Sequence, residues 1–159
     1  MSKMTNPMNA LLSFQEELSR GMPVQECELS QDYKLVFDQP NGRERFSYAK
    51  IQNGVVQALS QFALTDPIVG VVNFNLGYAV SEKYRGLGLG VESVLKGLAE
   101  LKNGFGRAGI KEFYIEAVVG LDNTPSIKVA EDIFGYNCNQ ITDHYSGELA
   151  WHYTKLIKI

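Results

Sequence analysis

The spacing of hydrophobic and polar positions changes twice along the chain. Apolar residues recur at helical spacing over residues 8–18, after Asn6 as N-cap and Pro7 as first helical residue, and Gly21 follows them. Residues 33–80 instead alternate between apolar and polar, as strands do when one face is buried. The first half of the chain therefore predicts one amphipathic helix followed by a β-meander.

Three turn signals divide the meander into strands. They lie at residues 39–42, 52–54 and 65–67, where Gly, Asn, Asp and Pro gather. The third is expected to separate a strand that ends at Leu64 from a strand over 68–80.

The second half begins with a glycine-rich run at residues 85–90. Apolar residues at helical spacing predict a helix over 91–101, which the glycines after it fray or end. Residues 113–119 are almost continuously apolar and predict a strand covered on both faces. A short helix that starts at Thr124-Pro125 and a closing strand pair over 140–159 complete a single α+β domain with a mixed sheet.

Composition narrows the class of protein. A chain of 159 residues with 45% hydrophobic and 21% charged residues suits one globular domain. Its 15 Lys and Arg against 18 Asp and Glu form no basic stripe, which argues against a nucleic-acid partner. The longest apolar stretches, such as 68–72, fall short of the ~18–20 residues that a bilayer needs, and no signal region follows the N-terminus. Cys27 and Cys138 are too few for a disulfide framework or a four-ligand zinc site, so we expect a cytoplasmic, metal-free protein without a membrane partner.

The glycine-rich run offers a candidate anion site. Between a strand and a helix, glycines free backbone N–H groups to point at one spot, where the helix N-terminus adds partial positive charge. A diphosphate suits such a site, and a plain strand-to-helix turn is the alternative. The P-loop is excluded because Val91-Glu92 follows Gly90 in place of Lys-Ser/Thr, and the spacing of the glycines does not fit the dinucleotide fingerprint G-x-G-x-x-G.

Residues 77–90 resemble the acyl-CoA loop of the GNAT superfamily of N-acyltransferases. Arg85, Gly88 and Gly90 fill its core, Gln/Arg-x-x-Gly-x-Gly/Ala. Residues 123–136, from Asn-Thr-Pro-Ser to Gly-Tyr, resemble the second signature of the family. The resemblance implies a GNAT-like fold, a single domain over 1–159 with an acyl-CoA-binding core at about 68–136, and acetyl-CoA as cosubstrate.

The resemblance also implies roles for individual residues, many through the backbone. The expected acyl-CoA-binding residues are Ala79 and Val80 for the pantetheine arm, Arg85, Gly86, Leu87, Gly88, Leu89, Gly90 and Val91 for the pyrophosphate, and Asn123 and Ser126 near the pantetheine. A Cβ at Gly88 or Gly90 would block close approach to the phosphates. The alternatives are a solvated loop side chain for Arg85 and helix capping for Asn123 and Ser126.

The implied chemistry is attack of a neutral amine on a thioester, which needs a proton acceptor. Glu116 is the leading candidate because residues 68–80 contain no carboxylate and an unpaired Glu in an apolar strand is costly. A structural, hydrogen-bonded Glu is the alternative. His144 and His152, in the closing strands, are alternative bases near neutral pH.

The proton donor to the leaving thiolate departs from the family pattern. Ala130 stands where many members carry Tyr, and Tyr136 is a candidate substitute.

Asn73 and Asn75 share one strand face and are candidate substrate contacts, with hydrogen bonding within the sheet as the alternative.

The sequence thus predicts an N-acetyltransferase that moves acetyl from acetyl-CoA directly to a primary amine, either a small molecule or a peptide. The acidic pI near 5.4 favours a cationic acceptor. The alternatives are a non-catalytic acyl-CoA-binding sensor or scaffold and a transferase of longer acyl groups, and a homodimer is possible.

Overall fold

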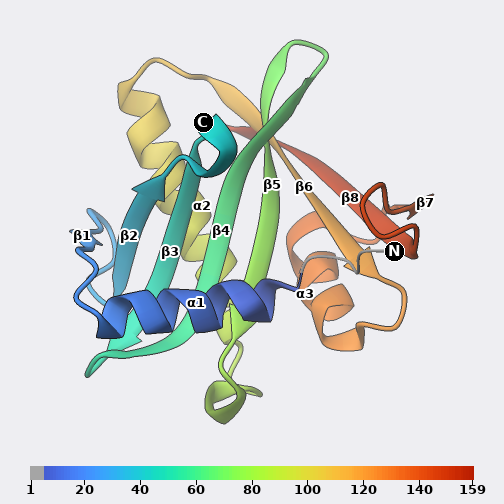
Figure 1. The fold of residues 1–159 in the computed structure, drawn as a ribbon. Coiled ribbons are helices and arrows are strands. Elements are labelled where there is room, and N and C mark those ends of the chain that lie inside the picture. The colour runs from blue at the N-terminus through green and yellow to red at the C-terminus, as the bar shows by residue number, and fades with distance from the viewer. Residues whose placement is uncertain (1–5) are drawn as a thin grey trace.

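A mixed eight-stranded sheet organises the computed structural model, which describes residues 6–159. In chain order the elements are α1 (Pro7–Ser19), β1 (Gln25–Glu26), β2 (Tyr33–Asp38), η1 (Pro40–Gly42), β3 (Arg45–Gln52), β4 (Val55–Ile68), β5 (Val71–Val80), η2 (Glu82–Tyr84), α2 (Leu89–Arg107), β6 (Glu112–Gly120), α3 (Thr124–Phe134), β7 (Asn139–Thr142) and β8 (Leu149–Lys158). The spatial order of the strands is β1-β2-β3-β4-β5-β6-β8-β7 (Figure 1). All neighbours are antiparallel except β5 and β6, which are parallel. This architecture confirms the predicted single α+β domain.

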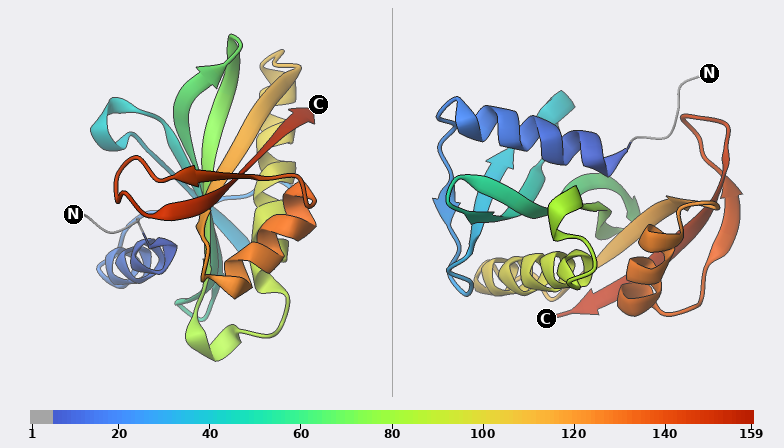
Figure 2. Two further views of the ribbon diagram at one scale, coloured as in Figure 1. Left: turned by 90° about the vertical axis from the view of Figure 1, so that its right-hand side faces the viewer. Right: turned by 90° about the horizontal axis from the view of Figure 1, so that it is seen from below.

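Helices cover both faces of the sheet. Leu11 and Phe14 of α1 pack in a cluster with Ala49, Val56 and Leu59 on one face. On the other face α2 and α3 cover the larger core cluster (Figure 2). In this three-layer arrangement α1 does not cover the sheet edge formed by β7 and β8 (Figure 2). No helix within residues 6–159 combines the length and apolar character needed to cross a bilayer.

The helix starts follow the local sequence. Asn6 caps α1, its side-chain oxygen accepting from Met8 N at 3.0 Å, as predicted. Asn123, and not Thr124, caps α3, accepting from Ser126 N at 3.2 Å. The helix α2 continues through its late glycines to Arg107, beyond the predicted end, and Phe105 in its last turns packs against Phe74 of the sheet.

Two predictions about strands are wrong. The turn expected at residues 65–67 is an irregular stretch inside β4, and the chain reverses at Val69-Gly70. The strand expected to be covered on both faces, β6, alternates between buried and half-buried positions. Its buried residues face α2 and α3, whereas Glu116 and its same-face neighbours lie on the face that carries α1.

The parallel pairing of β5 and β6 is short. It joins Asn73, Phe74 and Asn75 to Tyr114, Ile115 and Glu116, and no further pairs are formed although both strands continue. Figure 1 shows the two strands diverging beyond this point. The sheet is therefore split between the carboxyl-terminal halves of β5 and β6.

Replacing Val69 with Asn is expected to stabilise the protein by about 1 kcal/mol, since a β-branched residue at positive φ is strained. Val69 (φ 48°) and Gly70 (φ 75°) form a two-residue hairpin turn, and Val69 is almost fully exposed, so no packing is lost. The Asn53-Gly54 turn between β3 and β4 has the same conformation with the favoured residues. Urea unfolding of Val69→Asn should show a higher midpoint with an unchanged slope, and Asn53→Val should show the reverse; equal midpoints would contradict this.

Candidate functional site

The free edge of β5 forms one wall of the split. Ser81 N, just after β5, donates to Gln57 O of β4 at 2.9 Å. The alternation of an antiparallel ladder therefore turns the backbone groups of Ala79 toward β4 and those of Tyr78 and Val80 into the split. Of the two residues predicted for the pantetheine arm, Val80 has the suitable backbone direction and Ala79 pairs with β4. Hydrogen-bonding groups of an extended ligand fit such an edge.

The glycine-rich loop leads from β5 into an uncapped helix. Gly86 (φ 80°) and Gly88 (φ 75°) adopt left-handed conformations, and Gly88 is the N-cap of α2 without a side-chain cap. The backbone N–H groups of Leu89, Gly90 and Val91 come before the first helical hydrogen bond, from Glu92 N to Gly88 O. These free donors and the positive end of the helix are the features that an anion site requires, and binding of an anion by the loop stays a prediction.

Gly90 is required for packing against a helix, a reason that differs from the predicted one. A Cβ at Gly90 would lie 3.0 Å from a methyl group of Val129 on α3, whereas a Cβ at Gly88 would meet nothing within 4 Å. The close approach of α2 and α3 thus depends on Gly90, and a role of Gly88 in the access of a ligand to the loop stays a prediction.

Two charged side chains near the loop, Arg85 and Glu92, make hydrogen bonds within the protein. Arg85 lies exposed, with Nε donating to Val80 O at 3.3 Å. Glu92, in the first turn of α2, accepts from Tyr33 at 2.7 Å and from Lys50 at 3.0 Å. Burial alone would raise the pKa of Glu92, but these two donors outweigh it and hold the pKa below its usual value. Its charge is therefore compensated on the side of α2 that faces β2 and β3.

The start of α3 forms the opposite wall of the split. Tyr78 reaches across from β5 and donates its hydroxyl to Ser126 O at 2.6 Å, and burial raises the pKa of this phenol above its usual range. Asn123 acts as the helix cap, in agreement with the alternative interpretation of this residue. A role for Asn123 and Ser126 in acyl-CoA binding stays a prediction.

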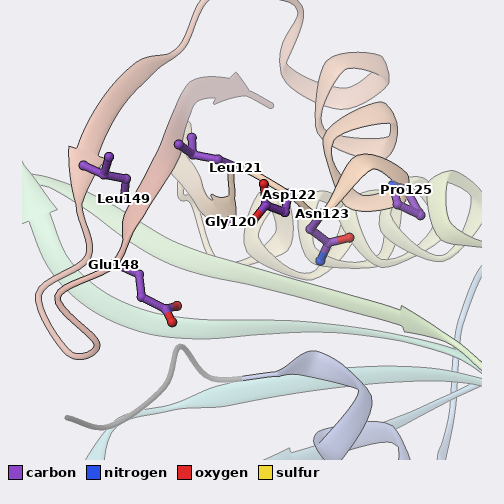
Figure 3. Close-up of a pocket in the computed structure, with 7 residues that line it drawn as sticks. All are labelled: Gly120, Leu121, Asp122, Asn123, Pro125, Glu148 and Leu149. Carbon is purple, nitrogen blue, oxygen red and sulfur yellow. The ribbon is translucent and has the colours of Figure 1, made fainter.

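A pocket of about 730 Å³ opens beside this wall, where β6 ends and α3 begins. Its lining residues are Gly120, Leu121, Asp122, Asn123, Pro125, Glu148 and Leu149. Figure 3 shows Glu148 extending into the pocket from the connection between β7 and β8, with Asp122 and Asn123 at the turn after β6. Two carboxylates in the lining give the pocket a negative potential.

A polar cluster of Asn73, Glu116 and His152 lies on the face of the sheet that carries α1. Asn73 Nδ2 donates to Glu116 Oε1 at 3.0 Å, and His152 Nε2 lies 2.7 Å from Glu116 Oε2. Asn73 is 1% exposed and also donates to Asp66 O at 3.3 Å, while its Oδ1 has no partner among the described residues. The sequence suggested an unpaired Glu116 in apolar surroundings. In the structure Glu116 is paired on both carboxylate oxygens and has polar neighbours.

Asn75 takes a different place from Asn73. It lies opposite Glu116 in the parallel register and is exposed on the same face. The predicted shared face is thus observed, and contact with a substrate stays a prediction for both residues. Sequence reasoning named His152 but missed its pairing with Glu116, because only the register of β6 with β8, which sets Val118 opposite His152, brings the two side chains together.

The structure gives no support to a tyrosine donor near α3. Ala130 is fully buried, and Tyr136 is 83% exposed after the end of the helix. Tyr153 is buried against Phe134, and burial, with the Cys138 thiol beside it, raises the pKa of Tyr153 to about 12. Proton donation by Tyr136 stays a prediction. His144 lies exposed between β7 and β8 with its ring against Tyr145, outside the polar cluster.

A second cavity, of about 260 Å³, lies between β1–β3 and the carboxyl-terminal half of α2. Burial and the nearby Glu100 raise the pKa of its Cys27 thiol to about 12, which disfavours the nucleophilic thiolate. Within residues 6–159, no three His, Cys, Asp or Glu side chains gather in a way that would hold a metal ion.

Solved structures with the same fold are acetyltransferases of low sequence identity. A GNAT-family acetyltransferase from Streptococcus pneumoniae has a TM-score of 0.53 at 12% identity, over 98% of this chain and 97% of that chain. A ribosomal-protein-S5-alanine acetyltransferase from Vibrio fischeri has a TM-score of 0.51 at 14% identity, over 72% of this chain and 62% of that chain. An apo structure of the ribosomal L7/L12 alpha-N-protein acetyltransferase, RimL, has a TM-score of 0.50 at 21% identity, over 71% of this chain and 61% of that chain.

These similarities establish the fold alone. The chain spans less than two thirds of the length of the RimL structure in complex with coenzyme A, 62%, and of the apo RimL structure given above, 61%. No curated protein sequence is significantly similar to it. The model of the acetyltransferase (GNAT) family, however, matches residues 11–136, which include the glycine-rich loop, the split and α3. The chain therefore belongs to the acetyltransferase (GNAT) family.

Proposed function

We propose that this protein transfers an acetyl group from acetyl-CoA to a primary amine by direct attack. One observation carries the proposal: the free edge of β5 leads through the glycine-rich loop to the uncapped N-terminus of α2, and the polar cluster spans the paired end of the same two split strands. An extended ligand with a diphosphate at one end fits this combination. The cluster then lies where a group at the other end would react.

The residues present fit acetyl-CoA. The N–H groups of residues 86–91 would hold its diphosphate, with Arg85 adding charge at the end of β5. The backbone of β5 near Val80 would pair with the pantetheine amides, opposite Asn123 and Ser126. Acetyl-CoA supplies a thioester carbonyl, which is activated toward attack by an amine.

The acceptor side favours a cationic amine. Asp122 and Glu148 line the pocket where β6 ends, several residues along β6 from Glu116, and their carboxylates would draw positive charge toward the split from a distance. A protonated amine must lose a proton before it attacks, and the cluster of Asn73, Glu116 and His152 is the proton-accepting group that the described residues bring to the split. A thiolate can leave without a dedicated acid, so Ala130 does not prevent turnover.

A sensor or scaffold that binds acyl-CoA without turnover is the second candidate function. It is favoured by Ala130, which puts a methyl group where many members of the family have a phenol. Acetylation of an amine would exclude this alternative.

Acetyl-CoA and CoA should each raise the melting temperature by about 5–10 °C at roughly one hundred times their Kd, because they bind only the folded state. NAD at the same concentration should produce no shift. Gly88→Trp should abolish the shift, because the indole would cover the amides of the loop. Gly42→Trp is the matched control, since it places Trp at a similar φ of 79° with open space around it, in the turn between β2 and β3. Wild-type protein that responds to neither CoA ligand would refute the proposed site.

Glu116→Gln should lower kcat/KM for the best amine by roughly 10–1,000-fold and leave the thermal shift with acetyl-CoA unchanged. The amine is chosen by release of CoA thiol from a panel of spermidine, tyramine, a lysine peptide and a peptide that begins with alanine. The alanine peptide is included because the Vibrio fischeri protein of this fold is named for alanine of ribosomal protein S5. Glu112→Gln, at the other end of β6, is the matched control and should keep wild-type activity. Equal activity of the two variants would remove Glu116 from the mechanism.

A further inference from the structure

Both oxygens of the Glu116 carboxylate are occupied, one by Asn73 Nδ2 and the other by His152 Nε2. We infer that His152 Nδ1 accepts the proton of the acceptor amine, and that Glu116 and Asn73 position the imidazole. This inference rests on the proposed function and assigns the roles within its polar cluster.

The carboxylate is held as an acceptor and not as a proton carrier. A proton on Glu116 would forfeit a charge-assisted hydrogen bond, to buried Asn73 on one side or to the imidazole on the other. A proton on His152 would instead strengthen its contact with Glu116, because a neutral imidazole becomes an imidazolium beside a carboxylate at 2.7 Å. Electrostatics therefore favours charge development on His152.

The same contact selects the tautomer. With Glu116 Oε2 as acceptor, Nε2 carries the hydrogen and Nδ1 keeps a lone pair. Nδ1 has no hydrogen bond among the described residues, and the His152 side chain is 26% exposed, so an incoming amine can reach it. Asn73 completes the arrangement, since its two donated bonds, to Glu116 and to Asp66 O, fix the carboxylate from inside the sheet.

Among the neighbours of His152 on the strands beside it, Glu116 is the charged one. In the register of the sheet, β6 sets Val118 opposite His152, and β7 sets Asn139 opposite it on the other side. Across the cluster, β5 contributes the neutral amides of Asn73 and Asn75. A proton on the imidazole is thus stabilised by one carboxylate and opposed by no cation from these strands.

The step balances as follows. The ammonium gives one proton to His152 Nδ1 and becomes a neutral amine. Its nitrogen forms a bond to the acetyl carbon as the carbon–sulfur bond breaks, and the second proton of the nitrogen goes to the sulfur. The products are the amide and the CoA thiol, and His152 returns its proton to water.

Nitrogen-15 NMR tests the tautomer without any turnover. The chain has two histidines, so His144→Gln leaves His152 as the sole imidazole. We expect this variant to show a protonated Nε2 and an unprotonated Nδ1 at pH above the titration of the ring. The reverse tautomer would overturn the inference, whether or not an amine substrate has been found.

His152→Gln separates proton acceptance from positioning. The Gln amide reaches the place of Nε2 and can still donate to Glu116, but it cannot accept a proton. At pH 7 we expect kcat/KM for the amine from the panel to fall roughly 100–10,000-fold, with the thermal shift by acetyl-CoA unchanged. The loss should shrink toward pH 9.5, where more of the amine is neutral without help. His144→Gln serves as the reference with wild-type rates.

The outcomes distinguish this inference from the proposed function. If wild-type protein acetylates an amine and His152→Gln stays within about fivefold of it, Glu116 acts alone and the inference fails. A loss that is the same at pH 7 and pH 9.5 would also overturn it, since a merely structural defect does not vary with amine ionisation. If wild-type protein binds acetyl-CoA but acetylates no amine, the proposed function fails, and the NMR result still decides the tautomer.

Discussion

The three-residue parallel pairing between β5 and β6 is the constraint on which the rest of the structure depends. It holds the two halves of the sheet together at Asn73–Asn75 and Tyr114–Glu116 and then ends while both strands continue. Longer pairing would close the edge of β5 and satisfy its backbone groups within the sheet. Shorter pairing would separate Asn73 from Glu116. The same few hydrogen bonds thus leave the rest of the β5 edge open and place a polar cluster where the pairing of β5 and β6 ends.

The polar side chains of Asn73, Glu116 and His152 are tolerated at this junction because each is hydrogen-bonded to another of the three. Asn73 is almost fully buried, and it donates both to Asp66 O on β4 and to Glu116 on β6. The carboxylate in turn contacts His152 on β8. This series of hydrogen bonds links four strands across the sheet, β4, β5, β6 and β8. Loss of any one side chain from it is expected to lower the stability of the fold. Its one buried atom without a partner in the described chain, Asn73 Oδ1, lies at the same place.

The glycines in and just before α2 have two different roles. Gly90 allows α3 to approach, and Gly97 allows the sheet to approach, since a Cβ there would lie 2.7 Å from a ring carbon of Phe62. These contacts fix the axis of α2 on the core. Gly86 and Gly88 instead allow left-handed turns that aim the first N–H groups of the helix outward. The glycines that allow close packing of α2 are therefore different from the glycines that shape the loop before it.

Local chemistry determined what the sequence alone could reveal. The caps at Asn6 and Asn123, the Asn53-Gly54 turn, the glycine-rich loop and the alternation of strands each depend on neighbours within a few residues. The turn at Val69-Gly70 escaped prediction because its first residue contradicts the preferences of the conformation, and the pairing of β4 with β5 imposes it. The tertiary structure alone decided that Asn73, Glu116 and His152 meet. Those residues come from three strands whose order depends on a helical crossover and a closing hairpin, and a register between distant strands is set by the burial of whole faces and not by any local signal.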